Sequence, residues 1–155
     1  MKTMTWKGKY FTLRELTKSD VADRKGISNK PSEGVQMNLQ RLVRNVLDPL
    51  REEWGAPIIV TSGYRCVRLN AAVGGARSSQ HVTGQAADIH TISDTREDNR
   101  KLRDLLIELG LPFDQLIDEF DCNWIHVSHK ESGNRGQLLS ARKKDGKTVY
   151  LAGIK

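Results

Sequence analysis

Two residues able to bind a metal lie seven positions apart in the segment SSQHVTGQAADIH (78–90): His81 and Asp88, with Gly84 between them. A polar turn that joins two short strands would also account for this segment. An imidazole and a carboxylate are, however, both common ligands of zinc in proteins. Two ligands do not complete a site, so a metal site requires a third ligand elsewhere in the chain.

The best candidate for a third ligand is His126, in the alternating segment NWIHVSH (123–129). In a strand, this alternation places His126 on the face opposite Ile125. If that strand lies near the segment that contains Asp88, and a turn brings His81 back, the three side chains could meet. Two imidazoles and one carboxylate suit zinc, and three protein ligands leave a fourth position open for water, which is typical of a catalytic site.

Helices are predicted on both sides of these segments. Residues 12–26 open with capping-box spacing and end in a glycine, which predicts a short first helix. Apolar residues recur with helical spacing over 35–54 and predict a long helix that packs on the core, and Pro49 should kink it or begin a second segment. A further helix, again with capping-box spacing at its start, is predicted over 94–110.

Runs of β-branched residues and alternating segments predict the strands. They are PIIVTS (57–62), AADIH (86–90), FDQLIDE (113–119), NWIHVS (123–128) and a closing hairpin in GQLLSARKKDGKTVYLA (136–152). Helices come first, and strands with one helix among them follow. This order predicts an α+β fold with a largely antiparallel sheet, in one domain that spans residues 1–155.

Length and composition restrict the class of protein. With 155 residues, of which 37% are hydrophobic and 28% charged, the chain can bury one core and is not typical of a disordered protein. It has no apolar run of about 18 residues, and its N-terminal segment has no apolar centre, so we expect neither membrane insertion nor a secretory signal peptide. Cys66 and Cys122 lack metal-finger spacing, and two thiols are expected rather than a disulfide.

The formal net charge of +6 suits an anionic partner such as nucleic acid, acidic lipid or an acidic cell-wall polymer. The charge is spread along the chain, and its densest cluster, ARKKDGK (141–147), contains the turn signal Asp145-Gly146 and is interpreted as a solvated hairpin tip. Aromatic residues make up only 6%, and no stripe interleaves them with basic residues. This pattern argues against a specific nucleic-acid partner.

The two candidate metal-binding segments together resemble the signature of a known family. SSQHVTGQAADI followed by WIHVS is similar to the M15 metallopeptidases, the zinc D-alanyl-D-alanine carboxypeptidases and their relatives, whose signature reads Ser-x-x-His, then Gly-x-Ala-x-Asp, then Trp-x-His. Other segments resemble the M15 subgroup found in phages and gut bacteria, so that the resemblance covers about residues 10–130. They are FTLRELTKSDVA, NLQRLVRNVLDPLR, PIIVTSGYRCVRLNAAVGGARSSQH and FDQLIDEF.

This resemblance implies a fold and a cofactor. The hedgehog signalling domain is similar in the same stretch, so the implied fold is the hedgehog/DD-peptidase fold, a small antiparallel sheet flanked by helices. The implied cofactor is one zinc ion per chain, held by His81, Asp88 and His126.

A zinc peptidase also needs a group that takes a proton from the attacking water. In many M15 enzymes this group is an acid three residues before the last histidine, but here that position is Asn123, whose amide cannot accept the proton. The hedgehog-like branch places its acid further upstream, at the end of a strand. We therefore expect Glu119 to be the base, with Asp121 as the second candidate; both acids could instead be charges on the rim of the site.

Two further residues have expected roles in binding. Arg65, in TSGYR, has a guanidinium group that could bind a substrate carboxylate bidentately or stabilise an oxyanion, and the family resemblance implies one of these roles. Ser79 is expected to hydrogen-bond the substrate or orient a ligand, although an ordinary loop serine is an equal alternative. The neighbouring Arg68 and Arg77 are interpreted as surface residues.

The expected function is zinc-dependent hydrolysis of a peptide bond in peptidoglycan stem peptides, by a D-Ala-D-Ala carboxypeptidase or a related cell-wall endopeptidase of the phage endolysin type. The protein would be made in the cytoplasm without a signal peptide and would act at the bacterial cell wall. A non-catalytic zinc module that binds a partner, as hedgehog domains do, is the alternative, and Asn123 is the residue that favours it.

Overall fold

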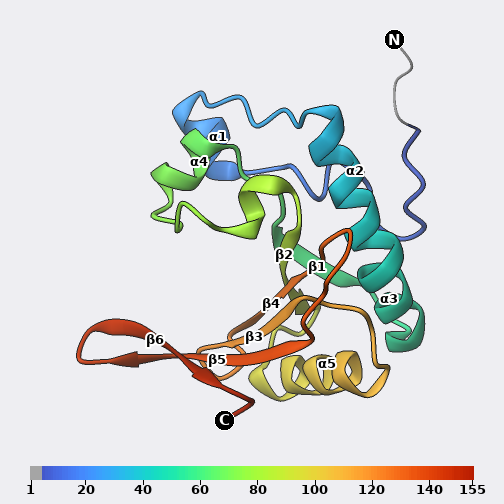
Figure 1. Cartoon of the computed structure of the whole chain (residues 1–155), viewed down its shortest axis with the longest axis vertical. Coiled ribbons are helices and arrows are strands. Elements are labelled where there is room, and N and C mark those ends of the chain that lie inside the picture. The colour runs from blue at the N-terminus through green and yellow to red at the C-terminus, as the bar shows by residue number, and fades with distance from the viewer. Residues whose placement is uncertain (1–4) are drawn as a thin grey trace.

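The computed structural model describes residues 5–155 and contains one six-stranded sheet with helices before and among its strands (Figure 1). The elements are α1 (Asp20–Lys25), α2 (Glu33–Leu42), the π-helical segment η1 (Val43–Leu47), α3 (Asp48–Trp54), β1 (Ile58–Ser62), α4 (Val67–Ala72), the 3-10 turn η2 (Gln80–Thr83), β2 (Ala86–Thr91), α5 (Arg96–Glu108), β3 (Gln115–Glu119), β4 (Trp124–Ser128), β5 (Gln137–Lys144) and β6 (Lys147–Ala152). The α+β class predicted from the sequence is confirmed.

The sheet is mixed rather than wholly antiparallel. Its strand order is β1-β2-β4-β3-β5-β6, and every neighbouring pair is antiparallel except β3 and β5. The exception follows from the pairing of β4, because β2 and β3 occupy both of its edges. The chain that leaves β4 must therefore cross to the free edge of β3, where it runs parallel to that strand.

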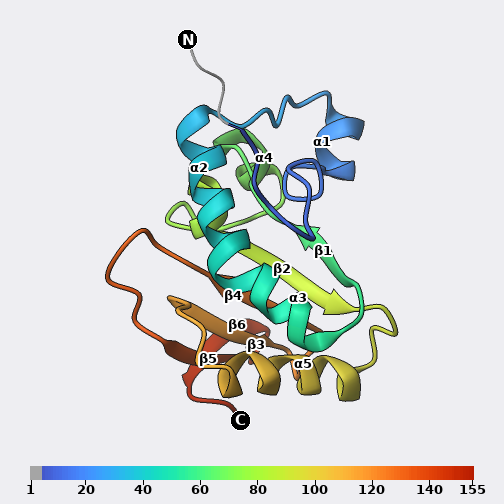
Figure 2. The same cartoon turned by 90° about the vertical axis from the view of Figure 1, so that its right-hand side faces the viewer.

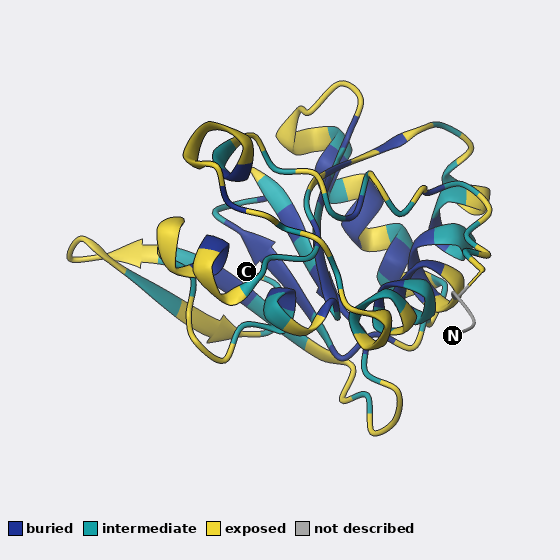
Figure 3. Ribbon diagram, turned by 90° about the horizontal axis from the view of Figure 1, so that it is seen from above, coloured by how far each residue is buried: buried dark blue, intermediate teal, exposed yellow. Residues whose placement is uncertain are grey.

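The two faces of the sheet differ in chemistry. The helices α2, α3 and α5 cover one face (Figure 2), and the core between them and the strands is apolar. This core includes Leu39, Leu42, Val46, Leu50, Leu102 and Leu106 from the helices and Ile89, Leu116, Ile125 and Val127 from the strands. Because side chains alternate along a strand, the residues between these apolar positions point to the other face. Figure 3 shows the buried central strands and the exposed tip of the β5–β6 hairpin.

Residues 12–26 do not form the single helix that the sequence predicts. Thr12 and Glu15 do make the reciprocal capping bonds, since the Thr12 N–H donates to Glu15 Oε1 over 3.0 Å and the Glu15 N–H donates to Thr12 Oγ1 over 3.2 Å. These bonds close only a turn. The helix α1 begins after Ser19, whose side chain caps it, and it ends at Gly26, whose φ of 64° favours glycine.

The long predicted helix is present, and it continues through Pro49 without a break. The segment η1 widens the backbone, and the N–H of Asp48 donates to the carbonyl of Val43, five residues earlier. Proline lacks the N–H that an α-helix would use here, and its ring would clash with the carbonyl four residues before it. The wider turn relieves both problems, so α3 begins at Asp48 with Pro49 in its first turn.

Cys66 and Cys122 are both free thiols, as expected. Within residues 5–155, none of the helices combines the length and the apolar character that a membrane crossing requires.

An uncommon turn joins β3 to β4. Phe120, Asp121 and Cys122 have positive φ values of 55°, 60° and 56°, a left-handed conformation that is unfavourable for residues with a Cβ. The buried carboxylate of Asp118 holds the turn by accepting the N–H of Cys122 over 2.8 Å. The turn reverses the chain directly after Glu119, and β3 and β4 can therefore pair along their whole length.

Asp118 also holds two arginines. It is fully buried and accepts hydrogen bonds from Arg103 Nη1 over 2.9 Å and from Arg142 Nη1 over 3.1 Å. Burial alone would raise the pKa of this carboxyl, but the bonds from Arg142 and from the Cys122 N–H outweigh it and lower the pKa below its usual range. Because the pKa in the folded state is below that of the unfolded chain, the stabilisation is complete above about pH 4 and is lost as the pH falls below it.

We expect Asp118→Asn to lower the free energy of unfolding by about 3–5 kcal/mol at pH 7, since it leaves two guanidinium groups without their buried charge partner. The variant should also lose less stability than the parent chain between pH 5 and pH 3. Urea unfolding across this pH range measures both effects.

Asp104→Asn is the matched control, because Asp104 binds the same Arg103 but is 63% exposed, and its loss should lower the free energy of unfolding by about 0.5 kcal/mol or less. Equal losses in the two variants would contradict this account.

Candidate active site

Asp88 and His126 are brought together by direct strand pairing. Asp88 lies on β2 opposite His126 on β4, and both point to the face of the sheet that no core helix covers. Side chains directly opposite one another on a sheet are close enough to interact. His126 Nδ1 lies 3.1 Å from Asp88 Oδ1. The sheet register alone therefore places two of the three predicted ligands together.

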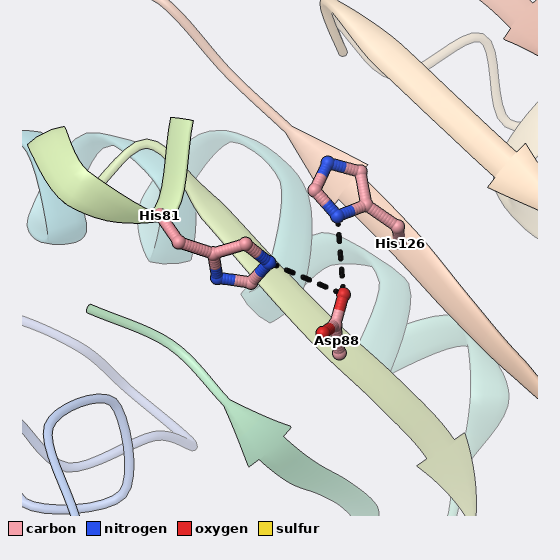
Figure 4. A group of neighbouring side chains, drawn as sticks. All are labelled: His81, Asp88 and His126. Carbon is pink, nitrogen blue, oxygen red and sulfur yellow. Dashed lines mark hydrogen bonds and ion pairs between the residues drawn. The ribbon is translucent and has the colours of Figure 1, made fainter. Parts of the chain in front are cut away.

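His81 reaches the same carboxylate from η2. Its Nε2 lies 3.3 Å from Asp88 Oδ1 (Figure 4). The N–H of His81 donates to Ser79 Oγ over 3.2 Å, which caps this short turn. The turn ends at Gly84, whose φ is 74° and whose backbone lies so close to Val35 of α2 that a Cβ would meet Val35 Cγ1 at 2.8 Å. Both constraints explain why a glycine stands between the two ligands.

The second nitrogen of His81 is held by the backbone. Its Nδ1 lies 2.7 Å from the carbonyl oxygen of Gly63, which can only accept, so Nδ1 carries a proton and Nε2 is the nitrogen that faces Asp88. Only a glycine fits at position 63, because a Cβ there would lie 2.3 Å from the carbonyl oxygen of Leu16. Hydrogen bonds of this kind fix the ring orientation of metal-binding histidines.

The charge state of Asp88 also suits a metal ligand. Burial raises the pKa of its carboxyl, but His81 and His126 together outweigh this effect and hold the pKa well below its usual range. Asp88 is therefore ionised at neutral pH.

These three side chains fit a zinc ion. Their candidate ligand atoms, one from each residue, all lie within 4.8 Å of one another. Tetrahedral bonds of about 2.0–2.2 Å would separate neighbouring ligand atoms by about 3.3–3.6 Å, close to the observed 3.1 and 3.3 Å. Nitrogen and carboxylate donors in this number are those of a catalytic zinc site.

A cleft of about 950 Å³ opens over the three residues. It is also lined by Arg65, Ser79 and Glu119, so the structure brings together all the predicted site residues except the second candidate for the base. Asp121 points elsewhere and binds Arg100, whose Nη2 lies 2.7 Å from Asp121 Oδ2. The base is therefore expected at Glu119.

Glu119 differs from the other acids nearby. Its carboxylate lines the cleft, is 8% exposed, and has no hydrogen-bond or ion-pair partner among the described side chains. Burial raises its pKa to about 7, with further increases from the charges of Asp88 and Asp118 and an opposing effect of His126. An unpartnered carboxyl with a pKa near neutrality is suited to exchanging protons with a substrate.

Asn123 lies outside the cleft. It is exposed at the end of the turn before β4 and does not line the cleft. The acid that lines the cleft is instead Glu119, at the end of β3.

Arg65 contacts the site through its backbone, and its side chain lines the cleft. Its N–H donates to the carbonyl of His81 over 3.0 Å. Its side chain is half-buried, and its Nε has no hydrogen-bond partner within residues 5–155. Burial lowers the pKa of its guanidinium group, and the charge of Asp88 partly compensates. Arg68 and Arg77 are exposed, as predicted.

The sequence did not reveal the part of the cleft formed by the closing hairpin. Lys143, Thr148 and Tyr150 from β5 and β6 line it together with Trp124. Alternation within 141–150 could have indicated which hairpin residues share a face, but the lysines of this segment were interpreted only as a solvated hairpin tip. Residues on separate hairpin strands can be assigned to the cleft only when the sheet order is known.

Comparison with known families agrees with this geometry. A family model described as Peptidase M15 matches residues 9–128. The chain belongs to the M15 peptidase family. It is therefore a hydrolase of the zinc metallopeptidase type that acts on a peptide substrate, and His81, Asp88 and His126 are its candidate zinc ligands. A search of curated protein sequences gave no match.

We expect the M15 chain to bind about one zinc ion per molecule, and His126→Ala to lose most of it, because two remaining ligands hold zinc poorly. Elemental analysis after dialysis measures the metal. Chelator should lower the melting temperature of the parent chain, since zinc stabilises the folded state by mass action. His90→Ala is the matched control, because the Nδ1 of His90 lies 2.6 Å from the carbonyl of Thr91 and outside the cluster. Full zinc content in His126→Ala would refute the assignment.

Proposed function

We propose that this M15 peptidase hydrolyses peptide bonds of peptidoglycan stem peptides, either as a D-Ala-D-Ala carboxypeptidase or as a related cell-wall endopeptidase. The observation that carries this proposal is the unpartnered carboxylate of Glu119 in the same cleft as the candidate zinc ligands. A structural zinc site would need neither an open cleft nor a free acid beside it.

The residues of the cleft have different roles in the proposed reaction. Zinc, when bound by His81, Asp88 and His126, supplies a Lewis acid that polarises the scissile carbonyl and makes water acidic enough to attack near neutral pH. Glu119 accepts the proton from the attacking water and then donates it to the leaving amine. The carboxyl must gain and lose a proton in each cycle, and its burial without an ion-pair partner, which raises its pKa, suits both steps.

Arg65 provides the positive charge in this scheme. Its guanidinium group lines the cleft beside His81 and carries unused donors. In a carboxypeptidase it would bind the terminal carboxylate of the substrate in a bidentate manner; otherwise it would stabilise the oxyanion of the tetrahedral intermediate. Ser79 supports the site by capping the turn that carries His81 and is also available to the substrate from the wall of the cleft.

The proposed place of action is the bacterial cell wall, as for phage endolysin-type enzymes. The net charge of +6 favours association with an anionic wall. A non-catalytic zinc module is the second candidate, and its support from the sequence was Asn123. That support is reduced because Glu119 occupies the cleft from the neighbouring strand.

The direct test is to incubate purified peptidoglycan fragments with the zinc-loaded protein and to identify new termini by mass spectrometry. Release of free D-alanine would indicate a carboxypeptidase, and new internal termini would indicate an endopeptidase. Both products should disappear with chelator. A zinc-loaded protein that cuts no wall peptide would favour the binding module.

Glu119→Gln should retain zinc and the fold, because the change is nearly isosteric and Glu119 is not a proposed ligand. Its turnover should fall by roughly 10²- to 10⁴-fold, the usual contribution of a positioned acid–base group. Asp121→Asn is the matched control, and it should change turnover little because Asp121 binds Arg100 outside the cleft. Initial rates on a wall peptide, with zinc content measured in parallel, distinguish the two. Undiminished turnover in Glu119→Gln would exclude Glu119 as the base.

A further inference from the structure

The β5–β6 hairpin forms one wall of the active-site cleft, although it lies after the family match, which ends at residue 128. It contributes Leu139, Lys143, Thr148 and Tyr150 to the lining. These side chains therefore belong to the part of the cleft that the shared peptidase region does not include.

The strand register explains why these residues face the cleft. β5 runs parallel to β3 with Ala141 opposite Glu119, and β6 places Tyr150 opposite Ala141. Residues two apart on a strand share a face, so Lys143 of β5 and its partner Thr148 of β6 lie on the same side as Glu119. Tyr150 is 58% exposed there, so its ring is available to a substrate.

Lys143 is a cation without an acidic partner. Its Nζ donates to Thr148 Oγ1 over 3.2 Å and lies 5.6 Å from the centre of the Phe120 ring, and no carboxylate of residues 5–155 is within ion-pair distance. An ammonium group has three donors, so two remain for a ligand. By contrast, the cleft residues Lys130 and Arg135 both bind the buried carboxylate of Asp114.

The two unpaired cations of the cleft stand on opposite sides of the candidate zinc ligands. Arg65 follows β1, and Lys143 belongs to β5, with β2, β4 and β3 between them in the sheet. His126 pairs with Ile117 of β3, which pairs with Leu139 of β5, so Lys143 lies two strand spacings of about 4.8 Å across the sheet from His126 and four residues of about 3.3 Å along it. The resulting separation of about 16 Å corresponds to about five residues of an extended peptide.

We infer that Lys143, supported by Thr148 and Tyr150, binds a carboxylate that the substrate carries about five residues before the scissile bond. This inference rests on the proposed function, with Arg65 in its carboxypeptidase role at the terminal carboxylate, so that the acyl side extends toward the hairpin. A peptide that crosses the strands would place one acidic group on each cation, with the cut bond between them. The tilted rings of Phe120 and Trp124, whose centres are 5.6 Å apart, offer apolar contact along this path.

The test compares two peptides, acetyl-Glu-Ala-Ala-Ala-D-Ala-D-Ala and acetyl-Gln-Ala-Ala-Ala-D-Ala-D-Ala, which differ only in charge at the fifth residue before the last peptide bond. Calorimetric titration uses zinc-loaded protein with Glu119→Gln, so that neither peptide is cut during the measurement. The Glu peptide should bind about five-fold more tightly than the Gln peptide, as expected for one partly exposed ion pair, and added salt should reduce the difference.

Adding Lys143→Gln should abolish this preference, and adding Lys143→Glu should shift it toward a peptide with lysine at the same position. Lys144→Gln is the matched control: it removes the same charge from the next residue, which points to the other face and does not line the cleft, and the preference should persist. Equal binding of the two peptides, or equal effects of Lys143→Gln and Lys144→Gln, would overturn the inference. If the proposed function itself is wrong, a different result is expected: zinc-loaded protein with Glu119 intact would cut neither peptide.

Discussion

The direct pairing of Asp88 with His126 across β2 and β4 is the constraint on which the site depends. The same register buries their neighbours, Ile89 and Ile125, against the helices. A slip of one residue would exchange the two faces, sending the ligands into the apolar core and the apolar side chains into the cleft. The burial energy of the core therefore fixes the geometry of the candidate metal ligands.

The third candidate ligand depends on a different part of the chain. His81 comes from a short turn, and a turn by itself would not fix an imidazole ring. Its orientation follows from the carbonyl of Gly63, which is positioned by the close approach of the Leu16 backbone to a residue without a side chain. The segment before α1 thus supports the site from a distance, through packing that only glycine permits.

Two adjacent acids on β3 show how strand alternation produces opposite chemistry. Asp118 faces the helices, where Arg103 and Arg142 keep it charged and make it a structural anchor. Glu119 faces the cleft, where burial without a partner raises its pKa to about 7. Neither intrinsic acidity nor sequence position distinguishes these carboxyls. The difference arises entirely from which face of the sheet each one occupies.

The sequence by itself determined the α+β class, most of the strands, and the three candidate ligands, because alternation and motif spacing are local properties. It left the base open between Glu119 and Asp121, because two residues along a chain that turns sharply can point in unrelated directions. It also did not predict the parallel pairing of β5 with β3, which depends on the occupied edges of β4. Only the tertiary structure shows that Glu119 and not Asp121 lines the cleft and that β5 pairs with β3, since both depend on contacts between segments distant in sequence, and the place of Lys143 in the cleft depends on them as well.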